Sequence, residues 1–221
     1  MRVLELCCGR NKSFSTVAAQ LGYEAVTLDN DPRCHPTILV DIRTWTHDYP
    51  PDHFDVIWAS PPCDALSLAN HRGNLEESDS ISKAVMAHLK YFRAKRFVEN
   101  PAAALPRRAN MAEYEAKLKR VTYCSYGLPY RKLTVIWDLD DSGWAPLPLC
   151  KADCPYSENG RHLTWAQHGL PRGALMDACR ARGLPTSFSP APPRASASLP
   201  RDPRGHAQAW TCASPPRASN A

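Results

Sequence analysis

The sequence lacks the features that would place the protein in a membrane or export it. No stretch of the 221 residues approaches the ~20 consecutive apolar residues that a membrane-spanning helix needs. The first residues, MRVLELCCG, do not contain the long apolar segment of a secretory signal. Internal repeats are also absent. We therefore expect one domain of ordinary size with appendages, located in the cytoplasm or nucleus rather than secreted.

The regular cysteine spacing of disulfide-rich secreted domains is missing as well. The chain has nine cysteines, but their spacing is irregular and Cys7 and Cys8 are adjacent. Together with the missing signal, this predicts reduced thiols inside a cell.

The formal charge of +5 is unevenly distributed along the chain. Residues 1–100 contain 11 Lys/Arg and 13 Asp/Glu, a net −2, whereas residues 101–221 contain 16 and 9, a net +7. A basic second half fits an anionic partner such as nucleic acid, although many enzymes carry similar charge without binding any.

Short apolar strands alternate with amphipathic helices, the first of which is expected to start at Ser13. Strands joined by helices imply parallel crossovers, so the pattern predicts an α/β fold with a doubly wound, mostly parallel sheet. The expected strands are 3–6, 25–28, 38–40, 54–59, 96–98, 121–124 and 133–137, and the expected helices are 14–21, 79–94, 111–119 and one starting near Pro171.

The composition changes near residue 185. From there to residue 221 the chain is rich in Pro, Ala, Ser and Arg and has no periodicity. We interpret 185–221 as a disordered, mildly basic tail, and favour a solvated tail over a nonspecific nucleic-acid-binding arm.

The apolar strand FDVIWA runs directly into SPPC. Prolines end strand pairing and fix the backbone, so Cys63 is either a nucleophile on a rigid mount or an inert buried thiol. Other polar residues also follow strands, and the carboxyl ends of parallel strands meet at one sheet edge, where ligands bind. An Asp at a strand end is more often a turn former, but the occurrence of polar residues after several successive strands favours a functional site. The strand ends carry Glu5 to Gly9, Asp29, Asp41, Ser60 to Cys63 and Glu99 to Pro101.

The ordered segments LELCCG, TLDND, VDI, SPPCDALS, VENP and YGLPYRKLT resemble the cytosine-C5 DNA methyltransferase family, most closely its compact branch in phages and large viruses. The resemblance covers roughly residues 1–137 and extends more loosely to about 183. Its Pro-Cys and Glu-Asn elements are specific as a pair, whereas the single-glycine first motif is not.

The resemblance implies a Rossmann-like methyltransferase fold and a catalytic role for the residues around Cys63. By match, Cys63 is the nucleophile that adds to C6 of cytosine, and the site should help its thiol to ionise. Glu99 matches the acid that holds N3 of the ring. Asn100 would orient the strand-end loop, and Pro61 and Pro62 would hold Cys63 in place.

The resemblance also implies S-adenosylmethionine as the methyl donor. Glu5 to Gly9 would shape the turn beneath its methionine part, Asp29 would bind the ribose hydroxyls, and Asp41 with Ile42 would hold the adenine. The implied cofactor-binding residues are Glu5, Leu6, Cys7, Gly9, Asp29, Asp41, Ile42, Ser60 and Pro61.

Two departures from the family pattern concern the cofactor turn and the base. A second glycine of the first motif is missing where the chain has Arg10 to Ser13. The Gln-x-Arg-x-Arg element of larger members is replaced by PYRKLT, in which Arg131 and Lys132 could contact the cytosine carbonyl or a flanking phosphate. A solvated basic turn is the alternative.

A third departure is the missing target-recognition domain, in place of which residues 138–170 form a short insert. It contains Cys150, Cys154 and His162. Such residues can hold zinc, but a structural site needs four ligands, so no metal is predicted and free thiols in a loop are favoured. His162 could equally bind phosphate.

The sequence thus predicts a methyltransferase catalytic domain over 1–184 that acts as a monomer on a cytosine flipped out of duplex DNA, with or without a partner that supplies specificity. RNA cytosine is the nearest alternative substrate. An amino-group methyltransferase would carry an aromatic residue where Cys63 stands. A nucleic-acid-binding protein without catalytic activity is disfavoured by Cys63 and Glu99.

Overall fold

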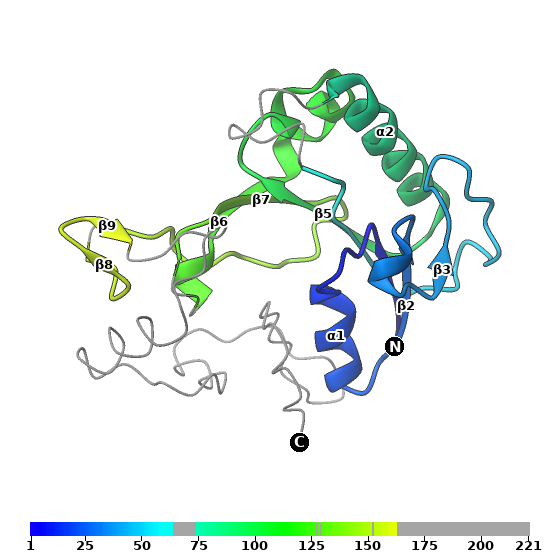
Figure 1. Ribbon diagram of the computed structural model, residues 1–221, viewed down its shortest axis with the longest axis horizontal. Coiled ribbons are helices and arrows are strands. Elements are labelled where there is room, and N and C mark those ends of the chain that lie inside the picture. Colours follow the sequence, from blue (N-terminus) through cyan, green and yellow to red (C-terminus); the bar gives the residue numbers. More distant parts are fainter. Residues whose placement is uncertain (64–73, 127, 129, 152, 163–221) are drawn as a thin grey trace. The chain divides into compact units, whose positions relative to one another are not determined.

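The computed structural model describes residues 1–63, 74–126, 128, 130–151 and 153–162 (Figure 1). They form two compact units. The sheet unit contains residues 1–119 and 135–144, and the hairpin unit contains the described residues of 120–134 and 145–162. The expected tail over 185–221 and the expected helix near Pro171 lie outside the described residues.

The sheet has seven strands in the order β3-β2-β1-β4-β5-β7-β6. The pairings of β1 with β2, β1 with β4, β2 with β3 and β4 with β5 are all parallel. The order reverses between β1 and β4, which confirms the doubly wound, mostly parallel sheet and places its topological switch point there. The strands are β1 (Arg2–Leu6), β2 (Glu24–Asp29), β3 (Ile38–Leu39), β4 (Val56–Ala59), β5 (Lys95–Pro101), β6 (Leu118–Thr122) and β7 (Leu133–Asp138).

Two helices pack on different faces of the sheet. Successive strand residues point to opposite faces. Leu4, Leu6 and Ile57 share a buried apolar cluster with residues of α2 (Leu75–Tyr91). On the other face, Phe14 of α1 (Ser13–Gln20) stacks on Trp58 with ring centroids 5.4 Å apart. Each helix thus buries an apolar stripe against the strands and leaves their carboxyl ends to the loops.

The start of α1 is held by Glu5 rather than by a serine side chain. The helix begins at Ser13 as expected, but its N-cap is Lys12, which has a left-handed backbone and forms no side-chain cap. The buried Glu5 carboxylate instead accepts the backbone N–H groups of Phe14 at 3.2 Å and Ser15 at 2.9 Å. Burial raises the pKa of this carboxyl, against the effect of those hydrogen bonds.

Several expected boundaries were wrong. Helix α2 begins at Leu75 rather than Asp79, because the Asn74 side chain accepts the N–H of Glu77 and caps it four residues earlier. The expected α-helix over 111–119 is a 3-10 helix, η4, after which β6 begins at Leu118 rather than at residue 121. The 3-10 helices are η1 (Pro32–Cys34), η3 (Leu105–Arg107), η4 (Ala109–Lys117) and η5 (Tyr123–Tyr126).

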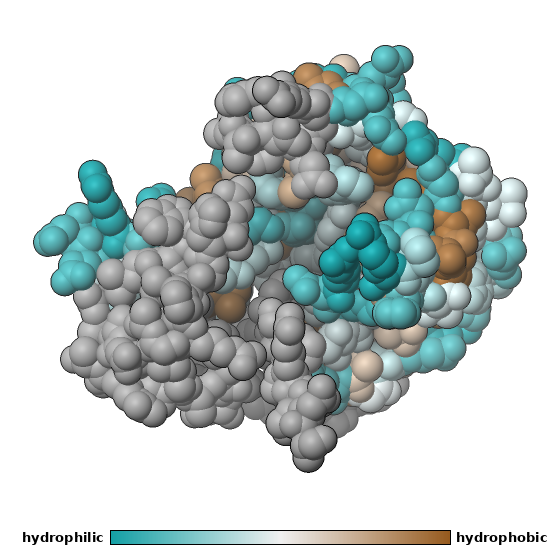
Figure 2. All heavy atoms as spheres, in the orientation of Figure 1, coloured by the Kyte–Doolittle hydropathy of each residue, from teal (hydrophilic) through white to brown (hydrophobic). Residues whose placement is uncertain are grey.

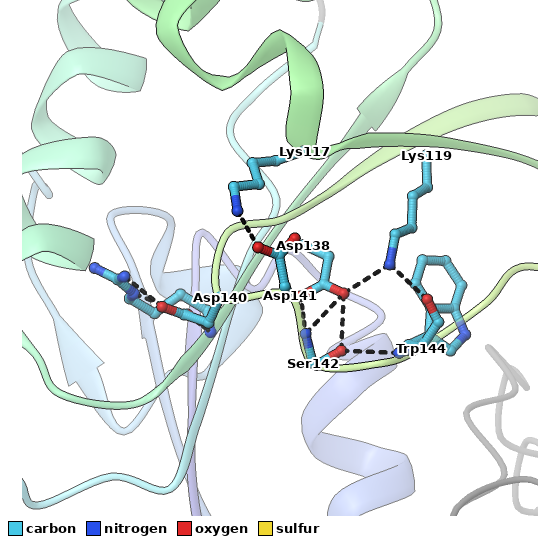
Figure 3. A network of polar contacts seen from close by, with 8 residues as sticks. Lys117, Lys119, Asp138, Asp140, Asp141, Ser142 and Trp144 are labelled. Atoms are coloured by element: carbon cyan, nitrogen blue, oxygen red, sulfur yellow. Dashed lines mark hydrogen bonds and ion pairs between the residues drawn. The ribbon is translucent and has the colours of Figure 1, made fainter.

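A polar network fastens the turn after β7 in the sheet unit (Figure 3). Asp138, only 1% exposed, accepts a hydrogen bond from the Lys119 ammonium at 2.8 Å. It also accepts the backbone N–H of Ser142 at 3.0 Å and its hydroxyl at 2.9 Å. Burial acts to raise the pKa of Asp138, but Lys119 and Ser142 outweigh it and the pKa is lowered.

Replacing Asp138 with alanine should lower the free energy of unfolding by about 2 kcal/mol. Breaking a fully buried ion pair costs more, but Lys119 remains 27% exposed and can regain water. The matched control is Asp141→Ala. Asp141 also pairs with a lysine, Lys117, but is 71% exposed, so the change should be below about 1 kcal/mol.

Urea unfolding at several pH values measures both variants. Because the folded-state pKa of Asp138 is lowered, its contribution is complete above about pH 4 and is lost as the pH falls further. Equal effects of the two variants at pH 7 would contradict a special role for Asp138.

The hairpin unit is built around a tight two-residue turn. Strand β8 (Ser157–Glu158) pairs antiparallel with β9 (Arg161–His162), and Ser157 lies opposite His162. Asn159 and Gly160 between them have φ angles of 50° and 74°. Two successive positive φ angles are the geometry that an Asn-Gly turn favours. Among the described residues of both units, no helix is long and apolar enough to cross a membrane.

Candidate active site

Strand register aligns the expected site residues of the sheet unit along one edge. Leu6 of β1 lies opposite Leu28 of β2 and Ala59 of β4, and Ala59 lies opposite Val98 of β5. The residues that follow these positions are Cys7, Asp29, Ser60 and Glu99. The four strands are parallel, so all of these residues stand at their carboxyl ends, across the switch point.

The loop that carries Cys63 is tied to the neighbouring strand β5. The Asn100 side chain is 1% exposed, and its amide nitrogen donates a hydrogen bond of 2.9 Å to the carbonyl of Pro61. The backbone N–H of Ser60 donates to the carbonyl of Leu6 at 3.1 Å. Pro61 is buried, Pro62 is exposed and Cys63 is half-buried. The loop is therefore anchored on both sides just before the cysteine, whose side chain remains accessible.

The Glu99-Asn100 pair presents polar groups at the same strand end. Glu99 is half-buried. The Oδ1 atom of Asn100 is buried and accepts no hydrogen bond from the described residues. Burying a polar atom without a partner is costly, and a catalytic role is one of the reasons for which such an atom is kept. Asn100 thus joins the loop of Cys63 to the strand that carries Glu99.

The turn after β1 is closed by Asp29 at the end of β2. One carboxylate oxygen accepts the backbone N–H of Gly9 at 2.9 Å, and the other accepts that of Asp31 at 2.9 Å. Gly9 has a φ of +59°, and apart from its two chain neighbours no described residue would lie within 4 Å of a Cβ at this position. The space next to Gly9 is therefore open, and Asp29 keeps capacity for further hydrogen bonds, since a carboxylate can accept about four.

Three other residues expected to contact the cofactor are already engaged within the protein. Ile42 is 5% exposed and belongs to the apolar core. The Asp41 carboxylate binds the Arg43 guanidinium, which lowers its pKa. Glu5 is buried beneath the turn, where it holds the start of α1. Its carboxylate thus supports the turn between β1 and α1 by fixing the first residues of the helix.

The adjacent thiols Cys7 and Cys8 are poorly suited to act as nucleophiles. Burial, and then the nearby Asp29 carboxylate, raise the pKa of Cys8 to about 12. The same two causes raise the pKa of Cys7. Both thiols stay protonated at neutral pH, and a protonated thiol is a weak nucleophile. Among the cysteines at this edge, Cys63 is the one placed on an anchored loop.

Arg131 and Lys132 belong to the hairpin unit. Arg131 is exposed, whereas the Lys132 ammonium lies over the Tyr123 ring, 4.9 Å from its centroid. The Lys132 carbonyl accepts the backbone N–H of Tyr123 at 3.2 Å. Arg131 is thus the more available of the two for an anionic ligand.

The hairpin unit also brings Cys150, Cys154 and His162 together with a fourth residue, Cys124. The ligand atoms of all four lie within 4.8 Å of one another. Cys124 was not foreseen from the sequence, because it precedes the other three by an entire strand and was expected to lie inside a strand. It lies instead in η5, directly after β6. The signal available in the sequence was a cysteine close to a predicted strand end.

The strand order and the switch point give the sheet unit a Rossmann-like methyltransferase fold. No family model matches the chain. A curated relative, the "Probable DNA (cytosine-5)-methyltransferase" of Frog virus 3 (isolate Goorha), is 31% identical over 179 residues, which cover 72% of this chain and 79% of the relative. The chain belongs to the cytosine-C5 DNA methyltransferase family.

Two solved human structures show a weaker likeness. They are described as a human methyltransferase 10 domain containing protein and as the N-terminal domain of human METTL16 in complex with SAH. Each is 14% identical over 63% of this chain with a TM-score of 0.40, and the matches cover 72% and 62% of those chains. Similarity at this level carries no argument about substrate.

Proposed function

We propose that the protein transfers a methyl group from S-adenosylmethionine to C5 of cytosine in DNA, with Cys63 as the nucleophile. The observation that carries this proposal is the anchored loop after β4. Asn100 holds Pro61 at 2.9 Å, and Cys63 follows in the loop after β4, the strand next to β5, which bears Glu99. A thiol and a carboxyl group at the carboxyl ends of adjacent parallel strands suit an attack on C6 of a ring whose N3 needs an acid.

The chemistry starts with the ring, because C5 of cytosine is a poor nucleophile. The Cys63 thiolate would form a bond to C6, which makes C5 electron-rich enough to take the methyl group. The bond between this methyl group and the sulfonium sulfur of S-adenosylmethionine would break, so that S-adenosylhomocysteine is the leaving group. The C5 proton is then lost to solvent and the bond between C6 and sulfur breaks, which restores the thiolate. A cysteine cannot reach C6 inside the stacked duplex, so the cytosine must be flipped out.

Glu99 and Asn100 support this attack in different ways. Glu99 offsets the charge that develops on the ring by holding a proton at N3. Asn100 fixes the loop through the Pro61 carbonyl, while its Oδ1 atom, which has no partner among the described residues, can accept a hydrogen bond from an amino group. Holding the reacting groups in place lowers the entropic cost of reaching the transition state.

S-adenosylmethionine would supply an electrophilic methyl group, and the residues at the switch point fit this ligand. Gly9 leaves open space for close approach of its methionine part. The Asp29 carboxylate can accept hydrogen bonds from ribose hydroxyls in addition to those from Gly9 and Asp31. Ser60 and Pro61 stand across the switch point from this turn.

Asp29→Ala should weaken S-adenosylmethionine binding by roughly 1.5–3 kcal/mol, about 10- to 150-fold, because hydrogen bonds to a charged acceptor are lost. Asp31→Ala is the matched control. Its carboxyl pairs with Arg33, which lowers its pKa to about 2, and its removal should leave affinity nearly unchanged. Isothermal titration calorimetry measures both. A normal affinity for the Asp29 variant would move the ribose contact elsewhere.

The small size of the hairpin unit leads us to expect a short or relaxed target of about two to four base pairs. Each base pair read in a groove needs well-placed side chains, each good pair contributing about 1–3 kcal/mol. The described residues of this unit are basic on balance, with five basic and two acidic side chains, so phosphate contacts should dominate. The basic residues are Arg120, Arg131, Lys132, Lys151 and Arg161.

Binding measured against salt concentration tests this expectation. About three to four phosphate contacts give a slope of log K on log salt near −3, and Arg131→Ala should reduce the slope by about one. Methylation mapped on random-sequence DNA reports the target. A strict six-base-pair site read by the isolated protein would contradict the expectation.

The methylated product identifies the reaction. The protein is incubated with radiolabelled S-adenosylmethionine and either duplex DNA or RNA, and the nucleosides are separated by mass spectrometry. The proposal predicts 5-methylcytosine from DNA. Preferential labelling of RNA would move the substrate class, and N4-methylcytosine or N6-methyladenine would replace the proposal with an amino-group methyltransferase.

A further inference from the structure

The hairpin unit contains a cluster of three thiols and an imidazole that the proposed methyl transfer does not use. Cys124 is buried, and Cys150, Cys154 and His162 are half-buried. The Nε2 atom of His162 lies 3.2 Å from the Cys154 sulfur and 3.5 Å from the Cys150 sulfur. All four ligand atoms lie within 4.8 Å of one another. Side chains from three separate segments thus converge on one point.

These separations match the edges of a zinc tetrahedron. With zinc–sulfur bonds of about 2.3 Å and zinc–nitrogen bonds of about 2.0–2.1 Å, tetrahedral geometry gives sulfur–nitrogen edges near 3.6 Å and sulfur–sulfur edges near 3.8 Å. The two nitrogen–sulfur distances fall close to this value. All separations are at most 4.8 Å, which is within about 1 Å of the sulfur–sulfur edge.

The backbone around the cluster holds the ligands in place independently of any ion. The N–H of Cys150 donates to the Thr122 hydroxyl at 2.8 Å, which ties this segment to the end of β6. Ser157 donates to the Cys154 carbonyl through its N–H at 2.9 Å and its hydroxyl at 2.8 Å. Ser157 also pairs with His162 across the hairpin. Two ligands therefore share a single anchor residue.

We propose that Cys124, Cys150, Cys154 and His162 bind one structural zinc ion. Three thiolates and one imidazole are a common zinc donor set, and four protein ligands leave no open position for catalysis. The ion joins the 145–162 segment to η5, the turn after β6. Both belong to the unit that carries Arg131 and Lys132. The described residues of this unit contribute few buried apolar side chains, so metal binding would supply much of their folding free energy.

The zinc content of the purified full-length protein tests the site. Elemental analysis should find about one zinc per chain in the wild type and in Cys63→Ser, which removes a cysteine from the sheet unit. Cys124→Ser and Cys154→Ser should each retain less than about a fifth of that zinc. His162→Cys should keep it, because it exchanges one zinc ligand for another, whereas His162→Ala should not. This readout is independent of methyl transfer, so either proposal can fail alone.

Two further measurements on the wild type keep the proposal testable if the serine variants fail to fold. Cobalt(II) exchanged into the protein should give the intense visible bands of a tetrahedral site together with thiolate charge-transfer bands. Chelation should make the bonds after Lys151 and Arg161 sensitive to trypsin, and added zinc should restore resistance. A metal-free protein with a Cys150–Cys154 disulfide, bound iron, or a Cys124→Ser variant with full zinc content would each overturn the proposal.

The surface of the hairpin unit is polar, as expected if the ion has a structural role. Figure 2 shows hydrophilic residues over the β8–β9 hairpin, and the exposed residues of this hairpin include Glu158, Asn159 and Arg161. Of the three thiols, Cys124 is only 6% exposed, and Cys150 and Cys154 are half-buried. The ion would therefore organise a polar, basic surface rather than form part of it.

Discussion

Cys63→Ser should reduce methyl transfer at least about a thousandfold, which corresponds to about 4 kcal/mol of activation free energy. A serine hydroxyl is far less ionised than a thiol at neutral pH and cannot form the bond to C6 at a useful rate. The anchors of the loop lie before this position, in the contacts of Asn100 with Pro61 and of Ser60 with Leu6, so they are retained. The melting temperature and the affinity for S-adenosylmethionine should therefore stay near those of the wild type.

Single-turnover assays with radiolabelled S-adenosylmethionine measure this change, with calorimetry and thermal melting as controls for cofactor binding and folding. A serine variant that keeps a tenth or more of the wild-type rate would reject Cys63 as the nucleophile. Loss of activity together with loss of cofactor binding would indicate a structural role instead.

Glu99→Gln should lower the rate of methyl transfer by about 10²- to 10⁴-fold, the usual contribution of a positioned acid. Glutamine keeps the size and polarity of the side chain, but its amide is too weak an acid to protonate N3. Because the change acts on the transition state, kcat should fall while binding of S-adenosylmethionine is preserved.

The matched control is Glu115→Gln in η4, an exposed glutamate whose replacement should leave kcat unchanged. Both variants are compared under multiple turnover. A variant at position 99 with wild-type kcat would remove this residue from the chemistry.

Much of the sheet unit could be predicted because local patterns and topology agree. Apolar runs such as 54–59 predict buried parallel strands, and residues that follow parallel strands necessarily meet at one edge. Asp29, Ser60 and Glu99 were placed there from sequence alone, and the register of β1, β2, β4 and β5 puts them there. The order of the motifs also indicated the family to which the chain belongs.

The parts that could not be predicted depend on contacts between residues distant in sequence. Glu5 shapes the turn by binding the start of α1, a contact that only the folded backbone creates. Ile42 lies in the core because residues of α2 pack over it, and the His88 ring hydrogen-bonds its carbonyl at 2.7 Å. Cys124 joins Cys150 and Cys154 only because η5 follows β6 and turns this thiol toward the insert.

Covalent trapping on DNA that contains 5-fluorocytosine tests the central claim most directly. Fluorine at C5 cannot leave as a proton does, so a cysteine that has added to C6 stays attached after the methyl group is transferred. The account predicts a stable protein–DNA complex that requires S-adenosylmethionine, whose tryptic peptide carries the adduct on Cys63 and which Cys63→Ser does not form. An adduct on another cysteine, or active methylation without any adduct, would contradict it.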